Sequence, residues 1–228
     1  MKNTITDIFF DLDHTLWDFD KNSEMAFETI FKKNHPTINI KEFIQKYVPI
    51  NQACWKLFQK DKITHIQLRY NRLRDSFDAI NYDISDEQIE QIANDYLLFL
   101  PENNHLFDGA IDVLEYLNPR YNLHIITNGF AQVQEKKLNN SNISGYFKSI
   151  TNSEMAGAKK PNPVIFEFAL NAAKAQKQSS IMIGDCIDAD VNGALDFGID
   201  AIFFNFNKVK VPENIKQINH LSELKNYL

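Results

Sequence analysis

The chain has 228 residues, of which 44% are hydrophobic and 24% charged, so it is long enough to bury a sizeable core. Its net charge of -6 argues against binding a nucleic-acid polymer, which needs a basic face. Two cysteines make a disulfide framework unlikely, the start of the chain lacks a signal peptide's apolar stretch, and no uncharged apolar run reaches the ~20 residues that span a bilayer. We therefore expect a cytoplasmic protein with no membrane partner.

Four short apolar segments predict the buried strands of a parallel sheet. They are residues 5–10 (ITDIFF), 122–127 (NLHIIT), 180–184 (SIMIG) and 201–205 (AIFFN). From the second segment onward, helical apolar patterns fill the gaps, so strands and helices alternate. This pattern predicts a doubly wound, Rossmann-like α/β core.

The stretch between the first two segments contains no convincing strand. Apolar residues recur in it at helical spacing, for example in the stripe Ile63, Ile66, Tyr70, Leu73 and Phe77. An all-helical block of this size is too long for a crossover connection. We therefore expect an inserted all-helical domain, residues 17–100, in a core made of residues 1–16 and 101–228.

Polar residues stand where each predicted strand ends. These are Asp11 and Asp13 after the first, Thr127 and Asn128 at the second, and Asp185 after the third, followed by Asp188 and Asp190. Lys160 precedes Pro161 at the start of a predicted helix. Taken singly, each has an ordinary alternative as a turn, a loop or a solvated lysine. Their common placement favours one site, because ligands of open α/β sheets bind beyond the carboxyl ends of the strands.

Four of these segments resemble the motifs of the haloacid dehalogenase-like hydrolase superfamily. DLDHT is similar to its DxDxT motif, and IITNG to its second motif, an apolar strand that ends in Thr or Ser. KKPNP resembles its lysine motif, GDCIDAD its GDxxxxD motif, and the inserted helical domain one type of its cap domains. The resemblance spans residues 11–190 and keeps the family's motif order.

The resemblance implies phosphoryl transfer through an aspartyl-phosphate. Asp11 would be the nucleophile, and Asp13 would protonate the leaving alcohol and later deprotonate the attacking water. Mg²⁺, a hard cation that prefers oxygen ligands, would bind the side chains of Asp11 and Asp185 and the backbone carbonyl of Asp13. The ion would also offset the repulsion between the paired carboxylates.

The family's remaining motif residues address phosphate. By resemblance, the Thr127 hydroxyl, the Asn128 backbone N–H and Lys160 would bind the phosphoryl oxygens. Lys159 stands next to Lys160, and the lysine before proline is the expected match. Asp190 would stand behind the ligands and orient either a metal-bound water or Lys160.

Asp13 also bears on the type of reaction. The dehalogenases of this superfamily lack an acid at this position, so the resemblance favours a phosphatase or phosphotransferase. Two other classes stay open: a receiver-type signalling domain, which carries Asp, Thr and Lys around Mg²⁺ on a similar sheet, and a catalytically silent binding protein. Steady turnover of any phosphomonoester would exclude both.

The segment Trp17-Asp18-Phe19 and the strand that ends in Asn205 resemble the pyrimidine 5′-nucleotidase branch of the superfamily. The partner implied is a small-molecule phosphomonoester, a nucleoside 5′-monophosphate with a pyrimidine base. Trp17 and Phe19 could stack on that base or simply pack inside the protein. Phosphoglycolate phosphatase and sugar-phosphate mutase are the alternatives, and nothing in the sequence indicates an oligomeric state.

Overall fold

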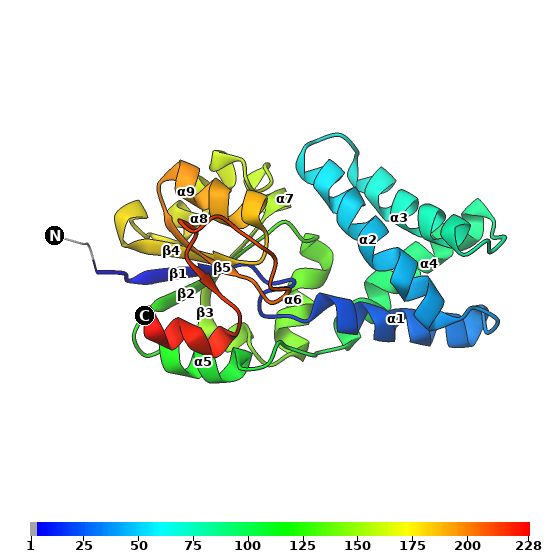
Figure 1. Ribbon diagram of the computed structural model, residues 1–228, viewed down its shortest axis with the longest axis horizontal. Coiled ribbons are helices and arrows are strands. Elements are labelled where there is room, and N and C mark those ends of the chain that lie inside the picture. Colours follow the sequence, from blue (N-terminus) through cyan, green and yellow to red (C-terminus); the bar gives the residue numbers. More distant parts are fainter. Residues whose placement is uncertain (1–3) are drawn as a thin grey trace. The chain divides into compact units, whose positions relative to one another are not determined.

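The computed structural model of the protein describes residues 4–228 (Figure 1). The chain divides into two compact units. One runs up to Phe19 and resumes at Asn104, and the other is Asp20–Asn103. Both divisions lie three residues later in the chain than the boundaries expected after residues 16 and 100.

The first unit is built on a six-stranded sheet. Its strands are β1 (Asp7–Phe10), β2 (Asn122–Thr127), β3 (Phe147–Asn152), β4 (Ser180–Gly184), β5 (Asp200–Phe204) and β6 (Gln217–Ile218). They lie in the order β3-β2-β1-β4-β5-β6, and every pairing is parallel. The order reverses at β1, so the predicted doubly wound α/β core is confirmed.

Helices of this unit cover both faces of the sheet (Figure 1). They are α5 (Ala110–Leu117), α6 (Ala131–Asn140), α7 (Ser153–Ala156), α8 (Pro163–Ala173) and α9 (Gly193–Phe197). All four residues of β1 are buried, because the strand is paired on both sides and covered on both faces. Phe9 packs in one apolar cluster with Phe166 of α8 and Ala194 of α9.

Two strands were not predicted from the sequence. They are β3 and β6, the edge strands of the sheet. β3 reads FKSITN and is only partly buried over its first four residues, so it lacks the continuous apolar run of a central strand. β6 has only two residues, which is too short for any periodicity.

The second unit is helical throughout, as expected. It contains α1 (Phe19–Asn34), α2 (Ile40–Gln59), α3 (His65–Ala79) and α4 (Asp86–Phe99). Thr64 and Ser85 open α3 and α4 with capping boxes. Buried rings fill its centre, with Phe27 in contact with Tyr47 and Tyr96. Within residues 4–228, no helix has the length and apolar character to cross a membrane.

Candidate active site

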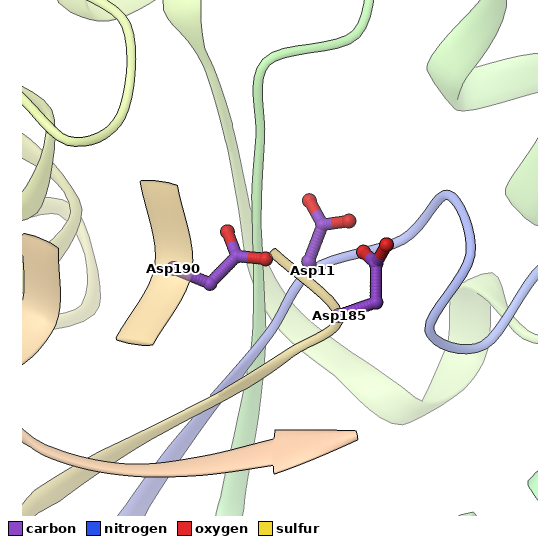
Figure 2. A group of neighbouring side chains, drawn as sticks. All are labelled: Asp11, Asp185 and Asp190. Carbon is purple, nitrogen blue, oxygen red and sulfur yellow. The ribbon is translucent and has the colours of Figure 1, made fainter. Parts of the chain in front are cut away.

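Asp11 and Asp185 lie side by side at the carboxyl edge of the sheet. Asp11 follows β1 and Asp185 follows β4, and these two strands are parallel neighbours. The Asp11 backbone N–H continues the pairing by donating to the Ile183 carbonyl at 2.9 Å. Asp190 joins them, and carboxylate oxygens of all three lie within 4.8 Å of one another. Figure 2 shows Asp11 between Asp185 and Asp190.

Lys160 supplies a buried positive charge to this cluster. Its side chain is 2% exposed, and Nζ lies 2.6 Å from Asp11 Oδ1 and 2.7 Å from Asp190 Oδ1. Nζ also donates to the Ile126 carbonyl at 2.7 Å, so each of the three ammonium hydrogens has an acceptor. Lys160, and not Lys159, is therefore the lysine whose ammonium group contacts Asp11.

Asn128 fixes the backbone of Lys160. Its side-chain amide donates to the Lys160 carbonyl at 3.0 Å, and its Oδ1 accepts the Lys160 backbone N–H at 2.8 Å. Thr127, the last residue of β2, accepts the Gly129 N–H on Oγ1 at 3.0 Å. Thr127 and Asn128 thus stand at the same edge of the sheet as Asp11. Their binding of phosphate, together with Lys160, stays a prediction.

Asp190 is buried and has both carboxylate oxygens engaged. Oδ1 contacts Lys160, and Oδ2 accepts the Cys186 backbone N–H at 3.0 Å. It lies in a π-helical turn, Ile187–Asn192, which begins two residues after Asp185. Asp190 was expected to orient either a metal-bound water or Lys160, and it contacts Lys160. The Asp190 carboxylate also lies within the carboxylate cluster, whereas the side chain of Asp13 does not.

Gly184, the last residue of β4, leaves the space that Asp190 occupies. A Cβ atom on Gly184 would lie 2.3 Å from Asp190 Oδ2 and 2.4 Å from its Cγ. Both distances are far below a normal contact. The absence of a side chain at Gly184 therefore lets the Asp190 carboxylate reach Lys160.

Burial and repulsion make Asp11 and Asp185 resist ionisation. Burial raises the pKa of Asp11 to about 7, against the attraction of Lys160, with Asp190 adding repulsion. Burial, followed by repulsion from Asp190 and Asp11, raises the pKa of Asp185 well above its usual range. One ammonium group faces three carboxylates, which leaves a deficit of positive charge. A divalent cation would fill it, and the oxygen donors suit Mg²⁺.

Asp13 turns its carboxylate toward α6. Oδ1 lies 2.6 Å from Nζ of Lys137, and Oδ2 accepts a hydrogen bond from the Gln134 side-chain amide at 3.2 Å. The sequence motif indicates Asp13 but neither of these partners. Their three-residue spacing places them on one helix face, a signal too common to single them out.

Trp17 and Phe19 are packed inside the protein. Trp17 is fully buried, and its indole N–H donates to Ser141 Oγ at 3.2 Å. Phe19 is 6% exposed. The Lys137 Nζ lies 4.3 Å from the centre of the Trp17 ring and 5.3 Å from that of Phe19. Of the two uses considered for these rings, their burial supports packing over stacking on a base.

The sequence of this chain is similar to a family of known hydrolases. The profile described as haloacid dehalogenase-like hydrolase matches residues 7–198. Pyrimidine 5′-nucleotidase PynA of Streptococcus pneumoniae is 32% identical over 87% of this chain and 83% of its own length. Pyrimidine 5′-nucleotidase YjjG of Escherichia coli is 28% identical over 97% of this chain and 96% of its own.

A solved structure has the same fold over the whole chain. It is that of the HAD-hydrolase YfnB from Bacillus subtilis, described as bound to magnesium and as revealing interdomain movement. The TM-score is 0.88, with 28% identity, and the match covers 99% of both chains.

Gly184→Ala tests how tightly the site is packed. We expect it to lower the free energy of unfolding by about 1–3 kcal/mol, because the new methyl group must displace the Asp190 carboxylate. Urea unfolding of both proteins measures the change. The matched control is Gly145→Ala, whose added Cβ has no neighbour within 4 Å and whose effect should stay within about 0.5 kcal/mol. Equal effects at the two positions would contradict the packing argument.

Proposed function

Since this chain belongs to the haloacid dehalogenase-like hydrolases, we propose that it is a Mg²⁺-dependent phosphatase that acts through an aspartyl-phosphate on Asp11. The observation that carries the proposal is the Asp11 carboxylate at the carboxyl end of the central strand. It is held 2.6 Å from the Lys160 ammonium and lies beside Asp185. The names of two relatives as pyrimidine 5′-nucleotidases support the same activity.

Asp11 is the proposed nucleophile. The oxygen that attacks forms a bond to phosphorus while the bond from phosphorus to the leaving alcohol breaks, and water later hydrolyses the aspartyl-phosphate. Lys160 holds Oδ1 of Asp11, which orients the carboxylate and favours its ionised form. The covalent intermediate replaces one difficult displacement by two easier steps.

Asp13 is the proposed acid and base. It gives a proton to the leaving oxygen in the first step and accepts one from water in the second. Its side chain is 19% exposed, unlike that of Lys160, so proton exchange with solvent is available to it. Its position two residues after Asp11 places it on the same loop as the nucleophile.

Mg²⁺ would be held by the side chains of Asp11 and Asp185 and by the Asp13 carbonyl. The carboxylate cluster and its excess negative charge support this site, as does the magnesium described for YfnB. When bound, the ion would neutralise charge on the phosphoryl group. Thr127, Asn128 and Lys160 would bind the phosphoryl oxygens, and Lys160 would exchange one of its present acceptors to do so.

A pyrimidine nucleoside 5′-monophosphate is the proposed substrate. The two relatives named pyrimidine 5′-nucleotidase support it, each matched over more than four fifths of both chains. We place the enzyme in the cytoplasm, where its two free cysteines, Cys54 and Cys186, would stay reduced.

Removing the metal should abolish activity. We expect hydrolysis of p-nitrophenyl phosphate to stop in excess chelator and to return when Mg²⁺ is added, because the carboxylate cluster lacks positive charge without the ion. Binding has its own measurement: Mg²⁺ should raise the melting temperature of the wild-type protein, and much less that of Asp185→Asn. Full activity in excess chelator would contradict the proposed metal site.

The two aspartates of the first motif should differ in effect. Asp11→Asn should abolish turnover and any covalent phosphoenzyme, because the nucleophilic oxygen is lost. Asp13→Asn should slow hydrolysis of an alkyl phosphomonoester by about 10²–10⁴-fold and still accept phosphate from a donor whose leaving group needs no proton. Acid-quenched labelling measures the phosphoenzyme. The control is Asp188→Asn, which changes an exposed aspartate in the turn Ile187–Asn192 and is expected to keep activity. A phosphoenzyme in Asp11→Asn would identify a different nucleophile.

Substrate choice is tested by comparing kcat/KM for dUMP, dAMP and phosphoglycolate at one Mg²⁺ concentration. We expect dUMP to be hydrolysed best, as the relatives' names suggest. An advantage of tenfold or more for phosphoglycolate or a hexose phosphate, about 1.4 kcal/mol of transition-state binding, would refute the nucleotidase assignment and leave the phosphatase assignment intact. No turnover of any phosphomonoester would favour a binding or signalling protein.

A further inference from the structure

Lys137 is a buried lysine to which the proposed reaction assigns no role. It lies on α6, and its side chain is 1% exposed. Burying an ammonium group costs several kcal/mol unless it is paired and hydrogen-bonded. Here the group is paired with Asp13 Oδ1 at 2.6 Å.

Aromatic rings also lie around this ammonium. Nζ lies over Trp17 and Phe19, at 4.3 Å and 5.3 Å from the ring centres. Ring faces attract a cation, so these contacts hold Nζ in place as well as covering it. The ammonium of Lys137 is thus fixed before any substrate is present.

The loop that carries Asp13 is tied to the same helix. Trp17 folds back on it, with its N–H donating to the Leu12 carbonyl at 2.9 Å and its carbonyl accepting the His14 N–H at 2.9 Å. The Trp17 indole in turn donates to Ser141, the C-cap residue directly after α6. These hydrogen bonds therefore fix the position of the backbone around Asp13 relative to the helix that carries Lys137.

Gln134 adds a second contact from α6. It donates to Asp13 Oδ2 at 3.2 Å, while Lys137 donates to Oδ1. Each carboxylate oxygen therefore has its own donor, and both donors come from one helix face. Two donors at two oxygens fix the plane of the carboxylate as well as its position.

We propose that Lys137 is a positioning residue for proton transfer: together with Gln134 it holds the Asp13 carboxylate in the orientation that reaches the leaving oxygen and the attacking water. The inference rests on the proposed function, in which Asp13 is the acid and base. Lys137 itself transfers no proton. In the first step the Asp13 proton goes to the leaving oxygen as the bond from phosphorus breaks. In the second a water proton goes to Asp13 as the aspartyl-phosphate is hydrolysed.

The test is the leaving-group dependence of kcat/KM in Lys137→Met. Methionine keeps the length and the contact with the aromatic rings but cannot hold the carboxylate. We expect kcat/KM for an alkyl phosphomonoester such as dUMP to fall by about 10–100-fold, because a misplaced acid loses much of its effect. For p-nitrophenyl phosphate, whose leaving group needs little protonation, the fall should be under about threefold. A merely structural role would lower both values equally.

Matched variants complete the experiment. Lys136→Met, the same change at the exposed neighbour on α6, should leave both values unchanged. If Lys137→Met fails to fold, Gln134→Met, which frees the other carboxylate oxygen, should show the same difference between the two substrates. Equal losses for both substrates, or no loss, would overturn the inference. Asp13→Asn, measured on dUMP and p-nitrophenyl phosphate, distinguishes a failure of this inference from a failure of the proposed function. If Asp13→Asn also lowers kcat/KM equally for both substrates, the proposed role of Asp13 fails. If it lowers kcat/KM more for dUMP, only the proposed role of Lys137 fails.

Discussion

The gathering of three carboxylates near one buried ammonium group is the constraint on which the site depends. Asp11, Asp185 and Asp190 come together only because parallel strands end at the same edge, and Lys160 alone among the described residues is placed to counter them from within. The rest follows from keeping that lysine in position. Asn128 clamps its backbone, and Gly184 leaves room for the aspartate behind it. The repulsion that remains is what the proposed divalent cation would offset.

The central strands were predictable because burial on both faces demands a continuous apolar run. β1 and β4 satisfy that demand, so both strands and the polar residues beyond them could be inferred from the pattern alone. β3 could not, since an edge strand tolerates the lysine and serine in FKSITN. Its omission did not affect the predicted site, because the reversal of strand order occurs at β1.

Within the site, most residues found from the sequence stand next to a strand end, and Lys160 and Asp190 were found through their motifs. Lys137 and Gln134 escape this reasoning because they lie in mid-helix, where a lysine ordinarily extends into solvent. Only the fold reveals that α6 passes Asp13 closely enough for both to reach its carboxylate. For Trp17 the sequence left two uses open, stacking on a base and packing inside the protein. Its burial and the Lys137 ammonium over its ring support packing.

The central place of β1 in the sheet has a consequence for biosynthesis. Asp7 pairs with Asn122 and with Ser180, so β1 leaves the ribosome before either neighbour and cannot be paired on both sides until β4 has followed. At typical rates of translation this wait is on the order of ten seconds. Meanwhile Ile8, Phe9 and Phe10 remain without the partners that bury them, whereas α2, α3 and α4 can pack on their neighbours in sequence as they emerge. The strand that leads into Asp11 thus obtains its two neighbours only late in synthesis.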